Sequence, residues 1–164
     1  MELQEIRTIY RGTERLTVLL LIFALPAFAM VYLNQSSGKI DWNLPQLPGF
    51  LEWALAGLSA MILVAHYVIF QRKIKLTFGQ PELLEKVKTY CQATGQRFWI
   101  LFLVSLLATL GLLLSQNPIF TLTFAVTMVF FSLGKPSPDR MARLMKLKKE
   151  DRELIREASR PEIN

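Results

Sequence analysis

Seventeen consecutive residues without a charge, Phe98–Leu114 (FWILFLVSLLATLGLLL), decide the fold class of this chain. A helix that crosses a membrane needs about 20 mostly apolar residues, within a range of about 17–25. Three further runs are almost as apolar, and they are Leu16–Leu33, Phe50–Phe70 and Ile119–Leu133. The last run is short, so we expect its helix to include Pro118 and Gly134. Four such runs separated by polar segments predict an all-α, polytopic membrane protein with four transmembrane helices.

The composition of the whole chain agrees with this fold class. Of its 164 residues, 52% are hydrophobic and only 20% are charged, and the mean hydropathy is +0.31. A soluble protein needs more charge than this to cover its surface. The composition therefore excludes a disordered chain, a disulfide-stapled secreted module and an ordinary cytosolic enzyme.

The first apolar run has an alternative interpretation as a signal peptide. Three arginines precede it, and it contains the small-residue pattern Ala27-Phe28-Ala29 after Pro26. This order of a basic segment, an apolar segment and an A-x-A-like site is typical of secretory signals. We expect instead a retained transmembrane helix that bends at Pro26, because proline removes one hydrogen bond and clashes with the preceding turn.

The 19 Lys and Arg residues are distributed asymmetrically around the apolar runs. Eighteen of them precede the first run, lie between the second and third runs, or follow the fourth run, whereas the segment 34–49 holds only Lys39. The positive-inside rule then predicts that both termini and the middle connection are cytoplasmic, in a bacterial inner membrane. Topology and attraction to anionic lipid headgroups explain the net charge of +6. No basic motif with interleaved aromatics indicates a nucleic-acid partner.

An internal repeat divides the chain. Residues 2–8 (ELQEIRT) resemble residues 82–89 (ELLEKVKT), and Arg15 and Arg97 each stand directly before an apolar run. We expect two tandem helical hairpins with amphipathic lead-ins, 1–80 and 81–135, and a basic amphipathic cytoplasmic tail, 136–164. Both hairpins start on the same side of the membrane, so the repeat would be a parallel one. Chance alignment of leucine-rich helices is the alternative.

A polar stripe crosses the second apolar run, the only run that contains ionisable groups. Glu52, Ser59 and His66 are spaced by seven residues, so they share one helix face. One interpretation is a polar track that lines a pore or a proton path. The other is packing contact between helices, where small and polar residues let backbones approach. We favour packing because there is no second buried charge to relay a proton.

Catalytic residue patterns are lacking in the sequence. The chain has one histidine, His66, and one cysteine, Cys91, and they lie in different segments. They do not form a nucleophile and base pair, and one of each cannot supply a metal site by spacing. A glycine-rich phosphate loop is also lacking. We therefore expect no catalytic residue, no cofactor, no metal and no enzymatic activity.

Two cytoplasmic helices are expected to begin at prolines. Gln80-Pro81 precedes the third run, and in the tail Pro136 ends the fourth helix, Ser137 caps a new helix and Pro138 opens it. The tail is amphipathic, so it lies on the membrane surface, packs on a partner protein or remains a solvated helix. The candidate contacts with lipid headgroups or a partner are Arg140, Arg143, Lys146, Lys148 and Lys149.

The segment from Pro136 to Arg140 (PSPDR) and the basic segment from Lys146 to Glu150 (KLKKE) carry a resemblance. With these motifs, the second half of the chain resembles uncharacterised small bacterial membrane proteins that have four spans and a similar prolyl exit. The resemblance implies the four-helix membrane fold. It implies no function and no site residue.

The pattern as a whole favours a non-catalytic integral membrane subunit, or an assembly or accessory factor, of a larger inner-membrane complex. Its partners would be other membrane subunits or further copies of the chain, together with anionic lipid at the cytoplasmic face. One alternative is a small oligomeric channel or transporter that uses the face formed by Glu52, Ser59 and His66. Another is a binder of anionic lipid surfaces that acts through the basic tail.

Overall fold

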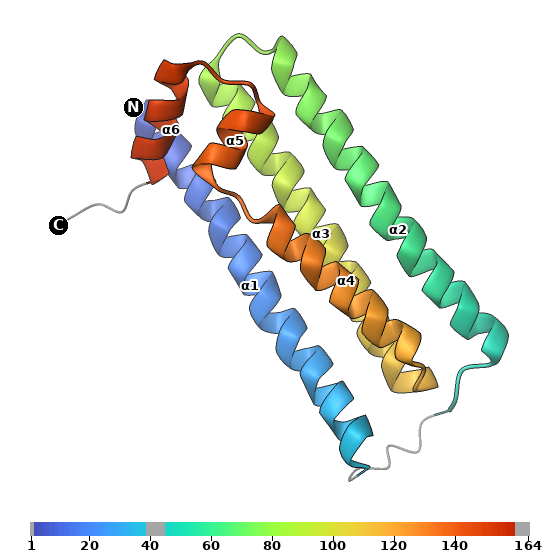
Figure 1. Ribbon diagram of the computed structural model, residues 1–164. Helices are drawn as coiled ribbons and strands as arrows, with labels where there is room; N and C mark the ends of the chain where they lie inside the picture. The colour runs from blue at the N-terminus through green and yellow to red at the C-terminus, as the bar shows by residue number, and fades with distance from the viewer. Residues whose placement is uncertain (1, 39–44, 160–164) are drawn as a thin grey trace. The chain divides into compact units, whose positions relative to one another are not determined.

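The computed structural model describes residues 2–38 and 45–159, and every regular element in these ranges is helical. These elements are six α-helices and a short 3₁₀ turn, η1, and the α-helices are labelled in Figure 1. Their bounds are α1 Glu2–Ser37, α2 Gly49–Leu76, η1 Thr77–Gly79, α3 Leu83–Ser115, α4 Pro118–Gly134, α5 Pro138–Leu144 and α6 Lys149–Ser159. The predicted all-α class is confirmed. The loop residue Lys39 lies outside the described residues.

Three helices, α1, α2 and α3, are long and apolar enough to cross a membrane. The fourth apolar run forms α4, which begins at Pro118 and ends at Gly134 as expected but has only 17 residues. It meets the same criterion only together with α5, from which it is bent by 86°. The described residues therefore contain three helices that could span a membrane, or up to four. Helix α1 continues through Pro26 as one helix.

A local sequence signal explains the start of α5. Ser137 caps α5, where its side chain accepts a hydrogen bond from the Arg140 amide at 3.3 Å, and Pro138 follows at the first helical position. This part of the tail prediction is confirmed. By contrast, α3 begins at Leu83, later than Pro81, and the first backbone bond here runs from the Lys86 amide to the Glu82 carbonyl.

Two helices end at non-glycine residues in the left-handed backbone region. Gln116 follows α3 with φ of 57°, and Lys146 follows α5 with φ of 52°. The Leu147 amide then donates to the Ala142 carbonyl at 3.0 Å, which is the long bond of a Schellman ending. Both ends use a polar residue where glycine is the commoner choice.

The helices contribute to two compact units, which we call the charged unit and the apolar unit. The charged unit consists of residues 1–18, 67–97 and 134–164, and the apolar unit of residues 19–66 and 98–133. Each unit draws on both expected hairpins, since the long helices contribute one part to each. The tail belongs to the charged unit.

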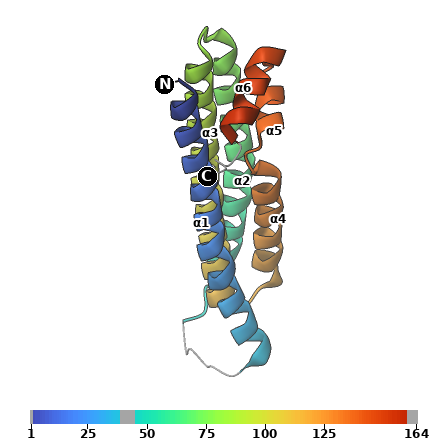
Figure 2. The same ribbon diagram turned by 90° about the vertical axis from the view of Figure 1, so that its left-hand side faces the viewer.

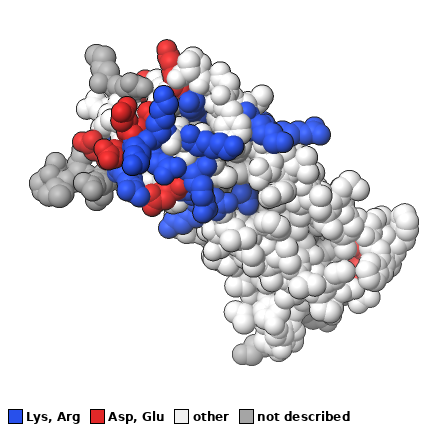
Figure 3. Space-filling view, turned by 45° about the horizontal axis from the view of Figure 1, so that its top comes forward, with Lys and Arg blue, Asp and Glu red and all other residues white. Residues whose placement is uncertain are grey.

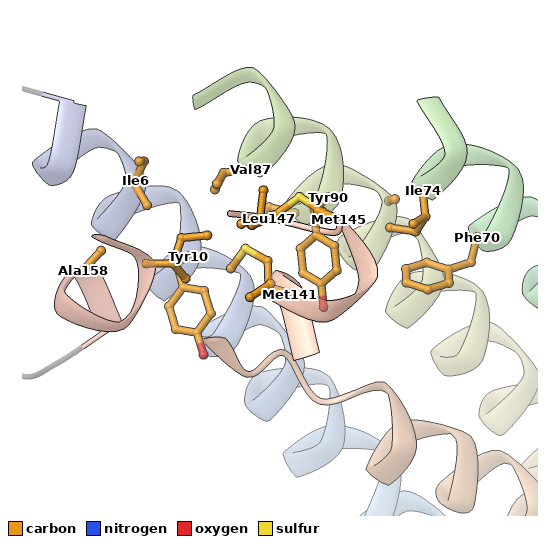
Figure 4. Packing of buried hydrophobic residues seen from close by; sticks show 14 residues of the cluster. Ile6, Tyr10, Phe70, Ile74, Val87, Tyr90, Met141, Met145, Leu147 and Ala158 are labelled. Atoms are coloured by element: carbon orange, nitrogen blue, oxygen red, sulfur yellow. The ribbon is translucent and has the colours of Figure 1, made fainter. Parts of the chain in front are cut away.

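A hydrophobic cluster fills the charged unit (Figure 4). The ends of α1, α2 and α3 supply one part of it, and α5 and α6 supply the rest. Its buried members include Ile6, Tyr10, Phe70, Ile74, Val87, Tyr90, Met141, Met145, Leu147, Ile155 and Ala158. The apolar face of the tail therefore packs on its own chain, an arrangement that we did not consider among the three interpretations of its amphipathic pattern.

Polar contacts also hold the tail in the charged unit. The Arg7 side chain donates to the Ala158 carbonyl at 3.2 Å, so it satisfies a carbonyl at the end of α6. The Tyr10 hydroxyl donates to the Pro136 carbonyl at 3.2 Å, and this bond is buried. Figures 1 and 2 both show α6 beside the start of α1.

The apolar unit has its own core, to which α1, α2, α3 and α4 each contribute buried residues. The rings of Phe28 and Phe124 stack with centroids 3.8 Å apart, next to buried Ala108 and Leu112. Gly111 of α3 meets the ring of Phe120, and a Cβ at Gly111 would lie 2.7 Å from Phe120 Cζ. Only a residue without a side chain allows this approach between α3 and α4.

The outer surfaces of the two units differ in charge. Every Lys and Arg of the chain except Lys39 belongs to the charged unit, and Glu52 is the one charged residue among the described residues of the apolar unit. Figure 3 shows the gathering of Lys and Arg. Large apolar side chains such as Ile22, Met61 and Leu122 are exposed on the apolar unit. Such a surface suits lipid rather than water.

Candidate functional site

The polar stripe predicted from the sequence lies on helix α2, within the apolar unit. Ser59 and His66 are 0% and 1% exposed, and Glu52 is half-buried. Ala56 and Leu63 are buried between them, so the stripe is the inward face of α2. Alternating steps of three and four residues between the buried positions are those of a helix that packs along a seam. The structure thus places all three candidate residues on the packed face.

Each member of the stripe has a defined neighbour. The His66 ring meets Phe130 of α4 edge-on, with centroids 5.1 Å apart and planes at 79°. The Ser59 hydroxyl donates to the Leu55 carbonyl one turn earlier at 2.9 Å. A hydroxyl bonded in this way is satisfied within its own helix and adds little polarity to the helix interface. Packed side chains therefore surround this part of the stripe.

Glu52 contacts the start of α4. Its carboxylate accepts a hydrogen bond from the Asn117 side-chain amide. The Asn117 side-chain oxygen in turn accepts from the Ile119 amide at 2.9 Å, so Asn117 caps α4 before Pro118. Glu52 thus holds the residue that caps α4, so this end of the stripe has a structural role.

Sequence reasoning missed Asn117 and a second polar contact nearby. The Gln35 side-chain amide donates to the Leu112 carbonyl at 2.6 Å, and this carbonyl near the end of α3 also accepts from the Gln116 amide at 3.0 Å. The motif Asn117-Pro118 carries the same cap-then-proline signal as Ser137-Pro138, so the sequence contained the signal for the cap of α4, although not for its contact with Glu52. Gln35 has no comparable signal, because its partner is a backbone group 77 residues away.

The five basic tail candidates differ in exposure. Arg143, Lys146, Lys148 and Lys149 are exposed, and Arg140 is half-buried. The Lys146 ammonium lies 5.3 Å from the centre of the Phe78 ring. The five residues follow one another from α5 to the start of α6, as a series of surface charges.

A buried arginine of the charged unit was also missed. Arg97 is 5% exposed, and its guanidinium carbon lies 4.9 Å from the centroid of the Phe70 ring. In the sequence, Arg97 is marked only by its place directly before an apolar run, as Arg15 is. Its spacing of seven residues from buried Tyr90 places it on the inward face of α3, and this signal was available in the sequence.

The cysteine lies in the charged unit, in the part of α3 that precedes the apolar run. Cys91 is buried, and burial raises the pKa of its thiol to about 11. Such a thiol is protonated at neutral pH and reacts slowly. Within residues 2–38 and 45–159, no three His, Cys, Asp or Glu side chains are grouped closely enough to hold a metal ion.

Comparison with known proteins yields no relative. The chain matches no protein-family model, no curated protein and no solved structure. Any function must therefore be inferred from the chain itself.

Proposed function

We propose that the chain is a non-catalytic integral membrane subunit, or an assembly factor, of a larger complex in a bacterial inner membrane. One observation carries the choice over a channel or transporter: Ser59 and His66, the centre of the polar stripe, are 0% and 1% exposed. A side chain that lines a water-filled path must contact that water. Shielding by neighbouring helices is the result that a packing role requires.

The contacts of the stripe support the same choice. Ser59 bonds within its own helix, His66 meets a phenylalanine ring, and Glu52 is bonded to a cap residue. Ionisable groups inside membranes are functional candidates by default. In this chain, Glu52 and His66 are the two ionisable residues of the stripe. Each of them makes a capping or packing contact that explains its presence.

The proposal includes four spans with both termini in the cytoplasm. Helix α4 supplies the fourth span, although its 17 residues measure about 25 Å along the axis, against a hydrocarbon thickness of about 30 Å. A small mismatch of this kind is tolerated by local thinning of the bilayer. The orientation rests on the 18 cations of the charged unit. The exposed aromatics Tyr32 and Trp53, and Tyr67 and Trp99, suit the two interfaces.

The proposal also includes the tandem repeat. Helices α1 and α3 support it, because each continues without interruption from a charged lead-in into an apolar run. The two equivalent arginines have diverged, since Arg15 is exposed and Arg97 is buried. If Arg15 and Arg97 arose by duplication, their different burial is consistent with two halves of the chain that now have different roles.

A stoichiometry measurement tests the proposed role. The full chain is tagged, extracted in a mild detergent and passed through size exclusion, and its complexes are weighed by native mass spectrometry. A second membrane protein in a fixed ratio to the chain is the expected result. A chain that purifies alone and conducts ions or solutes after reconstitution in liposomes would contradict the proposal.

A matched pair of variants tests the role of the stripe. Ser59→Leu places a large side chain at a fully buried position, so it should lower the stability of the helix bundle by about 1–3 kcal/mol. The control, Ala60→Leu, adds the same bulk at the next residue, which is exposed, and should be nearly neutral. If Ser59→Leu keeps its stability and instead blocks a measured flux, the stripe lines a path.

A further inference from the structure

Two large apolar side chains are exposed where α2 connects to α3, in the charged unit. Leu76, the last residue of α2, is 65% exposed, and Phe78 of η1 is 48% exposed. In the proposed orientation, Leu76 lies nine residues, or about 14 Å along the helix, beyond the interfacial residue Tyr67. The headgroup layer on each side of a bilayer is only about 5–8 Å thick. In that orientation, lipid does not explain the exposure of these two side chains.

The turn that carries Phe78 is held by hydrogen bonds on both sides of it. Thr77 is 0% exposed, and its hydroxyl donates to the Ile74 carbonyl at 2.7 Å. The Gln80 side-chain amide donates to the Thr89 hydroxyl at 2.8 Å, which ties the turn to α3. The turn is therefore ordered, and Phe78 stays at its surface without a partner. A side chain presented in this way loses little conformational entropy on binding, which favours affinity.

A basic segment of the tail meets this turn at Phe78. The Lys146 ammonium lies 5.3 Å from the centre of the Phe78 ring. The next residue, Leu147, is buried in the hydrophobic cluster of the charged unit, so the chain holds Lys146 at the surface beside the ring. Residues 143–149 contain four cations and residues 71–81 contain three, and neither segment contains an Asp or a Glu.

The combination of apolar and cationic groups indicates the chemistry of a binding partner. An apolar side chain that packs on Leu76 and Phe78 removes their exposed apolar surface from water, which is favourable. The neighbouring ammonium groups attract carboxylates and repel other cations, and such complementarity selects the partner and speeds its encounter. Aromatic residues are enriched in protein interfaces, and the rim of an interface is polar. An exposed ring bordered by ammonium groups has this arrangement.

We propose that Leu76, Phe78 and Lys146 form a docking surface, which we call the turn surface, for a partner protein. It binds a cytoplasmic segment of the partner in which carboxylates stand next to apolar side chains. The apolar side chains pack on Leu76 and Phe78, and the carboxylates pair with Lys146 and the exposed Lys75. This inference rests on the proposed function, because it gives the partner subunit its contact with the charged unit.

The first test uses the full chain in detergent and a short fluorescent peptide that alternates glutamate with leucine or phenylalanine. Fluorescence anisotropy measures the dissociation constant of this acidic apolar peptide. Phe78→Ser should weaken binding about fivefold or more, as truncation of a central interface residue does. The control, Leu154→Ser, truncates another exposed apolar residue of the charged unit and should change binding less than about twofold. If Phe78→Ser lowers the melting temperature, Leu76→Ser takes its place.

A second pair of variants tests the charge. Lys146→Gln should weaken binding of the acidic apolar peptide about threefold, which is the range of an exposed ion pair. The control, Lys135→Gln, removes the same charge from another exposed position of the charged unit and should have no measurable effect. Equal losses in the two lysine variants would show diffuse attraction and overturn the proposal. Equal binding of a peptide with serine in place of its apolar residues, or with glutamine in place of glutamate, would overturn it as well.

The complex itself separates this inference from the proposed function. When complexes are weighed by native mass spectrometry, Phe78→Ser should retain much less of the second membrane protein, and Leu154→Ser should retain it as wild type does. If both variants retain it, the turn surface is not the docking site, although the proposed function stands. If wild type purifies alone, the proposed function fails and the peptide variants decide on the turn surface. A photoreactive phenylalanine analogue in place of Phe78 that crosslinks to phospholipid in cells would assign this surface to the membrane and overturn the inference.

Discussion

The close approach of α3 and α4 at Gly111 makes a quantitative prediction. A Cβ added there lies within 4 Å of three atoms of the Phe120 ring, the farthest of them, Cζ, at 2.7 Å. Phe120 is 0% exposed and belongs to the core of the apolar unit, so its ring cannot move away without disturbing its neighbours. Overpacking of this kind costs about 1–3 kcal/mol. Alanine is the better helix former by about 1 kcal/mol, which offsets part of the cost.

Gly111→Ala should therefore destabilise the protein by up to about 2 kcal/mol, measured as reversible unfolding in detergent micelles. Gly57→Ala is the matched control, because a Cβ at Gly57 of α2 has no neighbour within 4 Å. That control should be neutral or slightly stabilising. In the double variant with Phe120→Leu, the cost of Gly111→Ala should shrink, because the two positions are in contact. Equal effects of Gly111→Ala and Gly57→Ala would refute the close approach.

Three further predictions concern the thiol, the topology and the tail. Cys91 should react slowly with maleimide at pH 7 and quickly once the chain is denatured in SDS, because burial protects the thiol and raises its pKa to about 11; fast labelling of the native protein would contradict its placement. In a Cys91→Ser background, a cysteine at Ser37 should be labelled from outside intact cells and one at Ser137 only after permeabilisation, and the reverse pattern would invert the topology. Tyr10→Phe should lower the free energy of unfolding by about 1 kcal/mol through loss of its buried bond to Pro136, whereas no change in a denaturant titration would show that the bond contributes nothing.

The sequence predicted the helices and their ends better than it predicted what packs against each helix. The bounds of α4 at Pro118 and Gly134, and the cap at Ser137, follow from local chemistry and are confirmed. The sequence predicted an amphipathic tail, and most of its apolar residues are buried, although Leu154 is exposed. It could not tell whether lipid, a partner or the chain itself covers that face, because all three present the same apolar surface to the helix.

The candidate site was predictable to a similar degree. A spacing of seven placed Glu52, Ser59 and His66 on one face, and Ser59 and His66 are buried. The neighbours were not predictable, because Phe130 and Asn117 come from distant parts of the chain. The start of α3 was placed two residues early, since a proline signal fixes a helix boundary only approximately.

The docking of α6 against the start of α1 bears on how the protein is made. Arg7 bonds to a carbonyl 151 residues later, and Ile6 shares a hydrophobic cluster with Ile155. A ribosome delivers the N-terminal residues first. The apolar side chains of Ile6 and Tyr10 therefore lack their contacts with α6 until α6 has been synthesised. A chain cut short before α6 would leave that surface exposed, so we expect proteases to degrade it faster than the full chain.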